Sequence, residues 1–328
     1  LRQPGSSFKP FVYLTALMNG YTPESVVLDA PINIGGWSPR NYGRSYRGPV
    51  TLLTALTRSI NVVPVRLAQN IGRDKIVETA KTVGIRSNLV ITRSLPLGTT
   101  EVTVLDMTGA YTVFANGGHR AIPFGIIEIR NSRSEVIYNH NENGPKPDQI
   151  IPQEKIAQLN QMLSSVVEYG TGRRAQLDFT VAAGKTGTTQ AYRDAWFMGF
   201  TGKYVGGVWF GNDDFTSTRR MTGGSLPAMT WKQFMVMAHR TRDIPPIVGA
   251  LDPRGLMQRP ETQVAENGLN PDGTPIDTTP QVSTLSKPMS NALERLESLF
   301  RESPPVEVTE PRQVSQSSPT RLARQETR

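Results

Sequence analysis

The stretch LRQPGSSFKPFVYLTALMNG, residues 1–20, places a serine and a lysine at the start of an otherwise apolar run. Apolar side chains recur after Ser6 at helical spacing, and Asn19-Gly20 is a typical helix stop, which predicts a helix from Ser6 to Gly20. Residues i and i+3 share one face of a helix, so Ser6 and Lys9 can approach each other. The stretch therefore predicts a hydroxyl and an amine side by side at a helix N-terminus.

Such a pair is suited to nucleophilic catalysis. A serine hydroxyl is a poor nucleophile unless a base takes its proton, and a lysine becomes that base only when burial or a nearby cation lowers its pKa. Free N–H groups at the helix N-terminus would stabilise an anion forming at Ser6. Ser-x-x-Lys arises by chance about once in a chain of this length. A helix cap beside a solvated Lys9 therefore also explains the stretch when it is taken alone.

A second polar pair, Ser59 and Asn61, lies between two runs with helical periodicity. Both side chains can point the same way across the apolar Ile60. An ordinary interhelical turn, with Asn61 as the cap of the following helix, is the alternative interpretation.

The third stretch, AAGKTGTT at residues 182–189, resembles a phosphate loop only superficially. That motif needs a glycine where Phe179 stands, and the surrounding pattern predicts a strand. In a strand, Lys185 and Gly187 share one face, with the neighbouring threonines on the other. A glycine on a strand face lets another backbone lie close, and lysine with threonine can bind the terminal carboxylate of a docked extended peptide.

The composition limits the kinds of site. The 328 residues include no cysteine and only three histidines, which excludes thiolate metal sites and disulfides and provides no helical His pair. The net charge of +8 comes without a basic block or interleaved aromatics, so no nucleic-acid partner is predicted. No apolar run is long enough to span a membrane.

The order of elements predicts an α+β fold. Helical patterns recur up to residue 172, with a turn-rich stretch at 21–49 and a hairpin pattern at 124–140. Three consecutive antiparallel strands follow within 179–212, with a tight turn at Gly202-Lys203 before the last one. A final helix is predicted at 226–240. We predict a domain at 1–242 and a Pro-rich, largely disordered tail at 243–328, with one short helical island near its middle.

Ser-x-x-Lys, Ser-x-Asn and Lys-Thr-Gly, in this order, are the signature of penicillin-binding proteins and serine β-lactamases. Stretches such as RQPGSSFKPFVYL, LTRSINVVPVRLAQ, VVEYGTGRRA and TGGSLPAMTW extend the likeness. Residues 1–242 resemble the transpeptidase domain of a class A, bifunctional penicillin-binding protein. The resemblance implies an antiparallel sheet flanked by helices. It also implies an N-terminally truncated chain that lacks two strands, a membrane anchor and a glycosyltransferase domain, and that is poorly active alone.

The resemblance implies a role for each motif residue. Ser6 would be acylated by a peptidoglycan stem peptide ending in D-Ala-D-Ala, and a second stem's amine would accept the acyl group; β-lactams would acylate the same serine. The implied roles are Lys9 as base, Ser59 as proton relay, Asn61 as ligand of the substrate amide, and Lys185, Thr186, Gly187 and Thr188 as the carboxylate-binding strand. The backbone N–H groups of Ser6 and Thr188 would form the oxyanion hole.

Two other functions use the same motifs. The first is a D,D-carboxypeptidase or β-lactamase-type hydrolase, although Glu101, Glu128 and Glu135 match no deacylating glutamate loop. The second is a non-catalytic β-lactam-binding module. The resemblance implies a periplasmic location, cell-wall synthesis proteins as further partners, contact with the membrane only through an upstream anchor, and no cofactor or metal.

Overall fold

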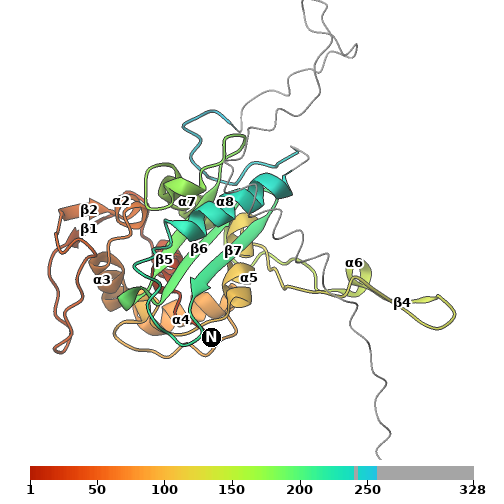
Figure 1. The fold of residues 1–328 in the computed structure, drawn as a ribbon, viewed down its shortest axis with the longest axis horizontal. Helices are drawn as coiled ribbons and strands as arrows, with labels where there is room; N and C mark the ends of the chain where they lie inside the picture. The colour runs from red at the N-terminus through yellow and green to blue at the C-terminus, as the bar shows by residue number, and fades with distance from the viewer. Residues whose placement is uncertain (240–242, 257–328) are drawn as a thin grey trace, which may run out of the picture. The chain divides into compact units, whose positions relative to one another are not determined.

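A three-stranded antiparallel sheet lies at the centre of this computed structural model, which describes residues 1–239 and 243–256 (Figure 1). Its strands follow each other in the order β5 (Ala183–Thr188), β6 (Asp194–Phe200) and β7 (Val205–Gly211). Thr201 N donates to Tyr204 O across the tight β6–β7 connection. The three predicted strands, their antiparallel order and this turn are confirmed, because aromatic and β-branched runs broken by turn residues specify them locally.

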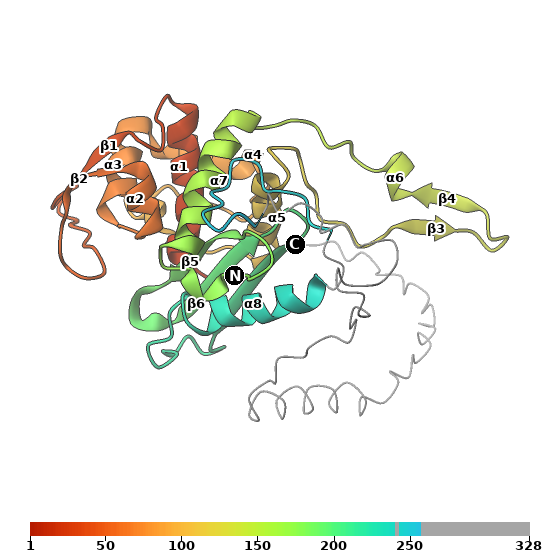
Figure 2. The ribbon, with the colours of Figure 1, turned by 90° about the horizontal axis from the view of Figure 1, so that it is seen from above.

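Helices cover both faces of this sheet. Helix α8 (Leu226–Ala238) lies on one face, and α5 (Val104–Ala115) and α7 (Gln153–Glu168) lie on the other (Figures 1 and 2). Adjacent glycines of β7 show the alternation: a Cβ on Gly206 would meet Trp231 of α8, whereas one on Gly207 would meet Thr108 of α5. Small residues on the strand thus let both helices approach closely.

Helix α1 (Lys9–Met18), which follows the 3-10 turn η1 (Gly5–Phe8), is buried along nearly its whole length. A helix that is apolar on every side belongs in a core, and Phe11, Val12 and Leu14 are fully buried. The remaining helical elements are α2 (Leu52–Thr57), α3 (Val62–Ile71), α4 (Arg73–Thr82), η2 (Leu95–Leu97), α6 (His140–Asn143), η3 (Arg173–Ala175) and η4 (Gln190–Tyr192).

The first residues of the chain are bound to segments far along the sequence. Arg2 and Val102 exchange two backbone hydrogen bonds of 2.9 Å each. The indole Nε1 of Trp196, in β6, donates to Gln3 O at 2.9 Å. The segment that carries Ser6 is therefore held by both the helical part and the sheet.

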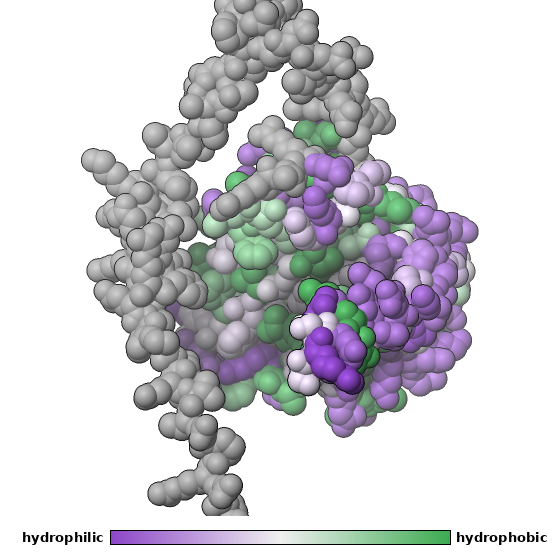
Figure 3. Space-filling model, turned by 90° about the vertical axis from the view of Figure 1, so that its right-hand side faces the viewer, coloured by the Kyte–Doolittle hydropathy of each residue, from purple (hydrophilic) through white to green (hydrophobic). Residues whose placement is uncertain are grey.

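Two short hairpin-like sheets complete the fold. The predicted hairpin at 124–140 is confirmed as β3 (Glu128–Arg130) and β4 (Val136–Asn139), which project from the body (Figure 2). On that side of the molecule, apolar and hydrophilic residues lie next to each other (Figure 3). Strands β1 (Val26–Asp29) and β2 (Gly48–Thr51) pair across a stretch for which only turns were predicted. No helix among the described residues has the length and apolar character needed to cross a bilayer.

The described residues after α8, within 243–256, pack against the rest of the body. Ile247 is buried in the core, Leu251 N donates to Ser164 Oγ at 2.8 Å, and Arg254 Nη2 lies 2.7 Å from Glu168 Oε1. The boundary predicted at residue 242 is therefore too early, because proline-rich composition alone does not reveal a segment that packs in extended form. The rest of the predicted tail, including its helical island, lies outside the described residues.

Candidate active site

Three backbone segments stacked on one another position Ser6. Gly5, with φ +54°, donates its N–H to Gly98 O at 3.0 Å. A Cβ on Gly98 would collide with Gly5 O, and a Cβ on Gly5 would come within 2.8 Å of Thr188 O. Glycine is needed at both positions because of these approaches and because of the positive φ. The half-buried Ser6 is thereby held beside the end of β5.

Lys9 reaches the second motif and makes no hydrogen bond with Ser6 Oγ. Its fully buried Nζ donates to Asn61 Oδ1 at 2.7 Å, Ser59 O at 2.8 Å, Ile60 O at 3.1 Å and Ser59 Oγ at 3.3 Å. Spacing along the helix predicted an approach of Ser6 and Lys9. The hydrogen bonds of the amine go to a turn fifty residues away, because that turn offers backbone and amide oxygens inside the core.

Ser59 connects the first and third motifs. Its Oγ accepts from Lys185 Nζ at 2.9 Å as well as from Lys9 Nζ. The residue has a positive φ of 56°, a backbone conformation that is uncommon for serine and concentrates at functional sites. One hydroxyl therefore stands between two buried amines.

Burial controls the charge of these amines. It lowers the pKa of Lys185 to about 7, and it lowers the pKa of Lys9 well below the usual value, with the charge of Lys185 as a second cause. Neither lysine forms an ion pair with a carboxylate among the described residues. Because two adjacent cations without an anion are unfavourable, one amine readily gives up its proton and can act as a base.

The strand of the third motif combines binding groups with tight packing. Thr186 Oγ1 lies 2.7 Å from Thr171 Oγ1, and Thr188 Oγ1 accepts from Gly223 N at 3.0 Å. A Cβ on Gly187 would collide with Pro4 O. We expected Gly187 to make room for a docked peptide. The absent side chain instead makes room for the chain's own backbone at Pro4.

These elements enclose a cleft of about 620 Å³, within the usual range for ligand sites. Five of the predicted residues line it, namely Ser6, Ser59, Asn61, Thr186 and Thr188. Lys9 and Lys185 lie beneath it, fully buried. Sequence reasoning assigned no role to the other lining residues: Tyr42, Arg58, Thr171, Arg173, Arg174, Thr222, Gly224 and Ser225. Several of them fall in VVEYGTGRRA and TGGSLPAMTW, which could have pointed to them.

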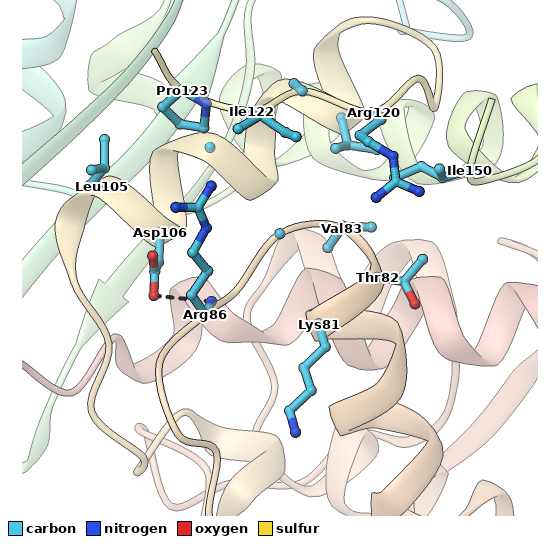
Figure 4. Close-up of a pocket in the computed structure, with 14 residues that line it drawn as sticks. Lys81, Thr82, Val83, Arg86, Leu105, Asp106, Arg120, Ile122, Pro123 and Ile150 are labelled. Carbon is cyan, nitrogen blue, oxygen red and sulfur yellow. Dashed lines mark hydrogen bonds between the residues drawn. The ribbon is translucent and has the colours of Figure 1, made fainter. Parts of the chain in front are cut away.

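A second cavity lies between α4, α5 and the segment around Arg120 (Figure 4). It contains none of the predicted site residues. Its single carboxylate, Asp106, accepts from Arg86 N at 3.2 Å and from Ser87 N at 2.8 Å. No group of three or more His, Asp or Glu side chains that could hold a metal occurs in the described part of the chain.

Comparison with known proteins shows the family of this chain. Residues 2–235 match the family described as the penicillin binding protein transpeptidase domain. The chain belongs to this family. Penicillin-binding protein 1A of Aquifex aeolicus is 39% identical over 277 residues, covering 80% of this chain and 38% of the relative. The protein of the same name from Pseudomonas aeruginosa is 33% identical, with 84% and 40% covered. The chain thus spans about two fifths of the length of these relatives.

Solved structures of the family share the fold. PonA1 of Mycobacterium tuberculosis in complex with penicillin V superimposes with a TM-score of 0.68 at 25% identity, covering 73% of this chain and 69% of PonA1. Penicillin-binding protein 1A from Haemophilus influenzae gives a TM-score of 0.66 at 26% identity, covering 78% of this chain and 47% of that one. The predicted penicillin-binding-protein fold, with antiparallel sheet and flanking helices, is confirmed.

Proposed function

We propose that this chain is a peptidoglycan D,D-transpeptidase that works through an acyl-enzyme on Ser6 and is covalently inhibited by β-lactams. The observation that carries the proposal is the shared hydroxyl of Ser59, which lies within hydrogen-bond distance of both buried lysines in the cleft that Ser6 lines. Membership of the family and the likeness to a penicillin V complex support it. The reaction would take place at the extracytoplasmic face of a bacterial inner membrane, beside the wall polymer.

In the acylation step, Ser6 Oγ attacks the carbonyl carbon of the D-Ala-D-Ala peptide bond and Lys9 takes the hydroxyl proton. Backbone N–H groups of Ser6 and Thr188 receive the developing oxyanion. Lys9 passes a proton to Ser59 Oγ, and Ser59 gives one to the leaving amine. The C–N bond breaks, the terminal D-alanine leaves, and an ester on Ser6 remains. Lys185, Thr186 and Thr188 hold the terminal carboxylate, and Asn61 holds a substrate amide.

In the transfer step, an amine of a second stem peptide attacks the ester carbonyl and a lysine accepts the amine proton. The C–O bond to Ser6 breaks, Ser6 Oγ regains a proton, and the new amide cross-links the two stems. A hydrolase would use water instead, and class A β-lactamases activate that water with a glutamate. No Asp or Glu lines this cleft, which argues against a hydrolase of the class A β-lactamase type.

The decisive experiment is intact-mass spectrometry after incubation with benzylpenicillin. The parent chain is expected to carry one persistent adduct and Ser6→Ala none. Ser7→Ala is the matched control, because Ser7 is an adjacent serine whose Oγ is occupied by Pro4 O at 2.7 Å, and it should still be acylated.

Two results would contradict the proposal. An adduct on Ser6→Ala would exclude Ser6 as the nucleophile. Rapid consumption of penicillin by a folded parent chain without a persistent adduct would identify a hydrolase.

A further inference from the structure

We propose that Asn41, in the loop between β1 and β2, is a positioning residue for the reaction. It binds the N-terminus of α3, so that the side chain of Asn61 stays available to Lys9 and to the substrate. Asn41 acts through Asn61 rather than on the substrate itself, and the buried Asp29 fixes its orientation. This inference rests on the proposed function and concerns two residues outside the three motifs.

Asn61 directly precedes α3 but does not cap it. Its φ of −87° and ψ of −37° are helical, whereas a capping residue usually has an extended backbone, and its side chain makes no capping hydrogen bond. The side-chain amide is bound elsewhere: Oδ1 accepts from Lys9 Nζ at 2.7 Å, and Nδ2 donates to Arg40 O at 2.9 Å. The N–H groups at the start of α3 therefore need an acceptor from another segment.

Asn41 supplies that acceptor from 20 residues earlier in the chain. Its Oδ1 accepts from Asn61 N at 3.0 Å and from Val62 N at 3.3 Å. Asparagine is itself among the preferred capping residues, so without Asn41 the side chain of Asn61 would turn back and cap α3. Lys9 would then lose its shortest hydrogen bond, and the cleft would lose the amide that is proposed to hold the substrate.

Asp29 determines which way the amide of Asn41 faces. Asp29 is the last residue of β1 and is 1% exposed; its Oδ1 accepts from Asn41 Nδ2 at 2.7 Å and its Oδ2 from Arg47 N at 3.0 Å. An ionised carboxylate only accepts hydrogen bonds, so it selects the NH2 group of the amide and leaves Oδ1 for α3. Asn41 Nδ2 also donates to Ser45 O at 2.9 Å. Aspartate at position 41 would instead place two carboxylates against each other.

The first test is a double-mutant cycle that measures the rate of acylation by benzylpenicillin in Asn41→Ala, in Asn61→Ala and in the variant with both changes. Asn41→Ala should slow acylation by about tenfold, which corresponds to one hydrogen bond to a charged group. In the Asn61→Ala background it should cause no further loss, because the residue through which it acts is gone. Thr103→Ala is the matched control: it removes the side chain that caps α5 through Asp106 N at 3.0 Å, and it should keep the parent rate.

The second test exchanges the two partners. Asn41→Asp alone should be as slow as Asn41→Ala, because its carboxylate faces that of Asp29. Asp29→Asn combined with Asn41→Asp keeps the net charge and restores a donor opposite an acceptor, with an oxygen of residue 41 still available to α3. The exchanged pair should therefore recover most of the lost acylation rate. If Asn41→Ala does not fold, this comparison decides.

A crystal structure of Asn41→Ala should show Asn61 with an extended backbone and its side chain bound to an N–H of the first turn of α3. An unchanged Asn61 in that crystal would overturn the inference. Additive losses in the cycle, or a folded exchanged pair as slow as Asn41→Asp, would do the same. Failure of benzylpenicillin to acylate the parent would instead overturn the proposed function. The crystal structure does not depend on acylation, so the two failures remain distinguishable.

Discussion

The Oγ atom of Ser59 accepts hydrogen bonds from Lys9 and Lys185, and this shared acceptor couples the charges of two buried amines. Each lysine alone would favour the neutral form because it is buried. Together they do so more strongly, since a charge on Lys185 is a second cause of the lowered pKa of Lys9. The residues that hold the lysines in place are thus also those that keep a base available.

The coupling predicts how acylation depends on pH. Lys9 is the proposed base, and a lysine with a lowered pKa is neutral above that pKa and charged below it. The rate of acylation by benzylpenicillin should therefore fall as the pH drops through the lowered pKa of Lys9. Lys185→Gln removes the charge that lowers the pKa of Lys9. The pKa of Lys9 should rise, and the acid limb of the pH–rate profile should move to higher pH.

Lys185→Arg is the matched comparison, because it keeps a positive charge beside Lys9 and should leave the limb near its original position. Rates are measured by stopped reactions and mass spectrometry over about pH 5–9. An identical limb in the parent chain and in Lys185→Gln would show that the two amines are not coupled.

At the scale of elements, the nucleophile depends on how η1 packs against β5 and the turn after η2. Gly98→Ala would place a methyl group against Gly5 O at a positive φ of 71°. We expect it to lower the free energy of unfolding by about 3 kcal/mol and to slow acylation, because η1 must shift away from Thr188.

Gly20→Ala provides the control for this change. Gly20 also has a positive φ, of 90°, but a Cβ there would meet nothing within 4 Å. It should lose about 1 kcal/mol of stability and keep the parent acylation rate. Chemical denaturation and the penicillin adduct measure the two effects. Equal acylation rates in the two variants would contradict the proposal that the close contact of Gly98 with Gly5 positions Ser6.

The elements that the sequence predicted well are those determined by local pattern. Long periodic helices, the three consecutive strands and the 124–140 hairpin follow from side-chain spacing and turn residues. The β1–β2 pair was missed because two four-residue strands lie within a stretch of turn residues and pair only through tertiary contacts. The partners of Lys9 were missed for a similar reason, since spacing along one helix cannot reveal a turn that packs over it.

At the scale of the whole molecule, Glu168 is a buried acid that joins the sheet-covering helix α7 to the segment after α8. Its carboxylate lies 2.7 Å from Arg254 Nη2, and only 2% of its side chain is exposed. Arg254→Ala would leave this charge unpaired and should lower the free energy of unfolding by about 2 kcal/mol, because the arginine is itself partly exposed.

Arg133→Ala breaks an exposed pair instead, with Glu135, and should change stability by less than about 0.5 kcal/mol. Thermal and chemical unfolding of both variants gives the comparison. A loss of stability no greater for Arg254→Ala than for Arg133→Ala would show that residues 243–256 contribute little to the packed body.

The attachment of the first residues to distant segments also determines when the nucleophile can form during synthesis. Ser6 leaves the ribosome before its partners do, because Trp196, which binds Gln3 O, and Thr188, which Gly5 lies against, are made about 180 to 190 residues later. Until then the serine is an ordinary hydroxyl on an unanchored segment. A nascent chain therefore exposes its future nucleophile well before the segments that hold it in place exist.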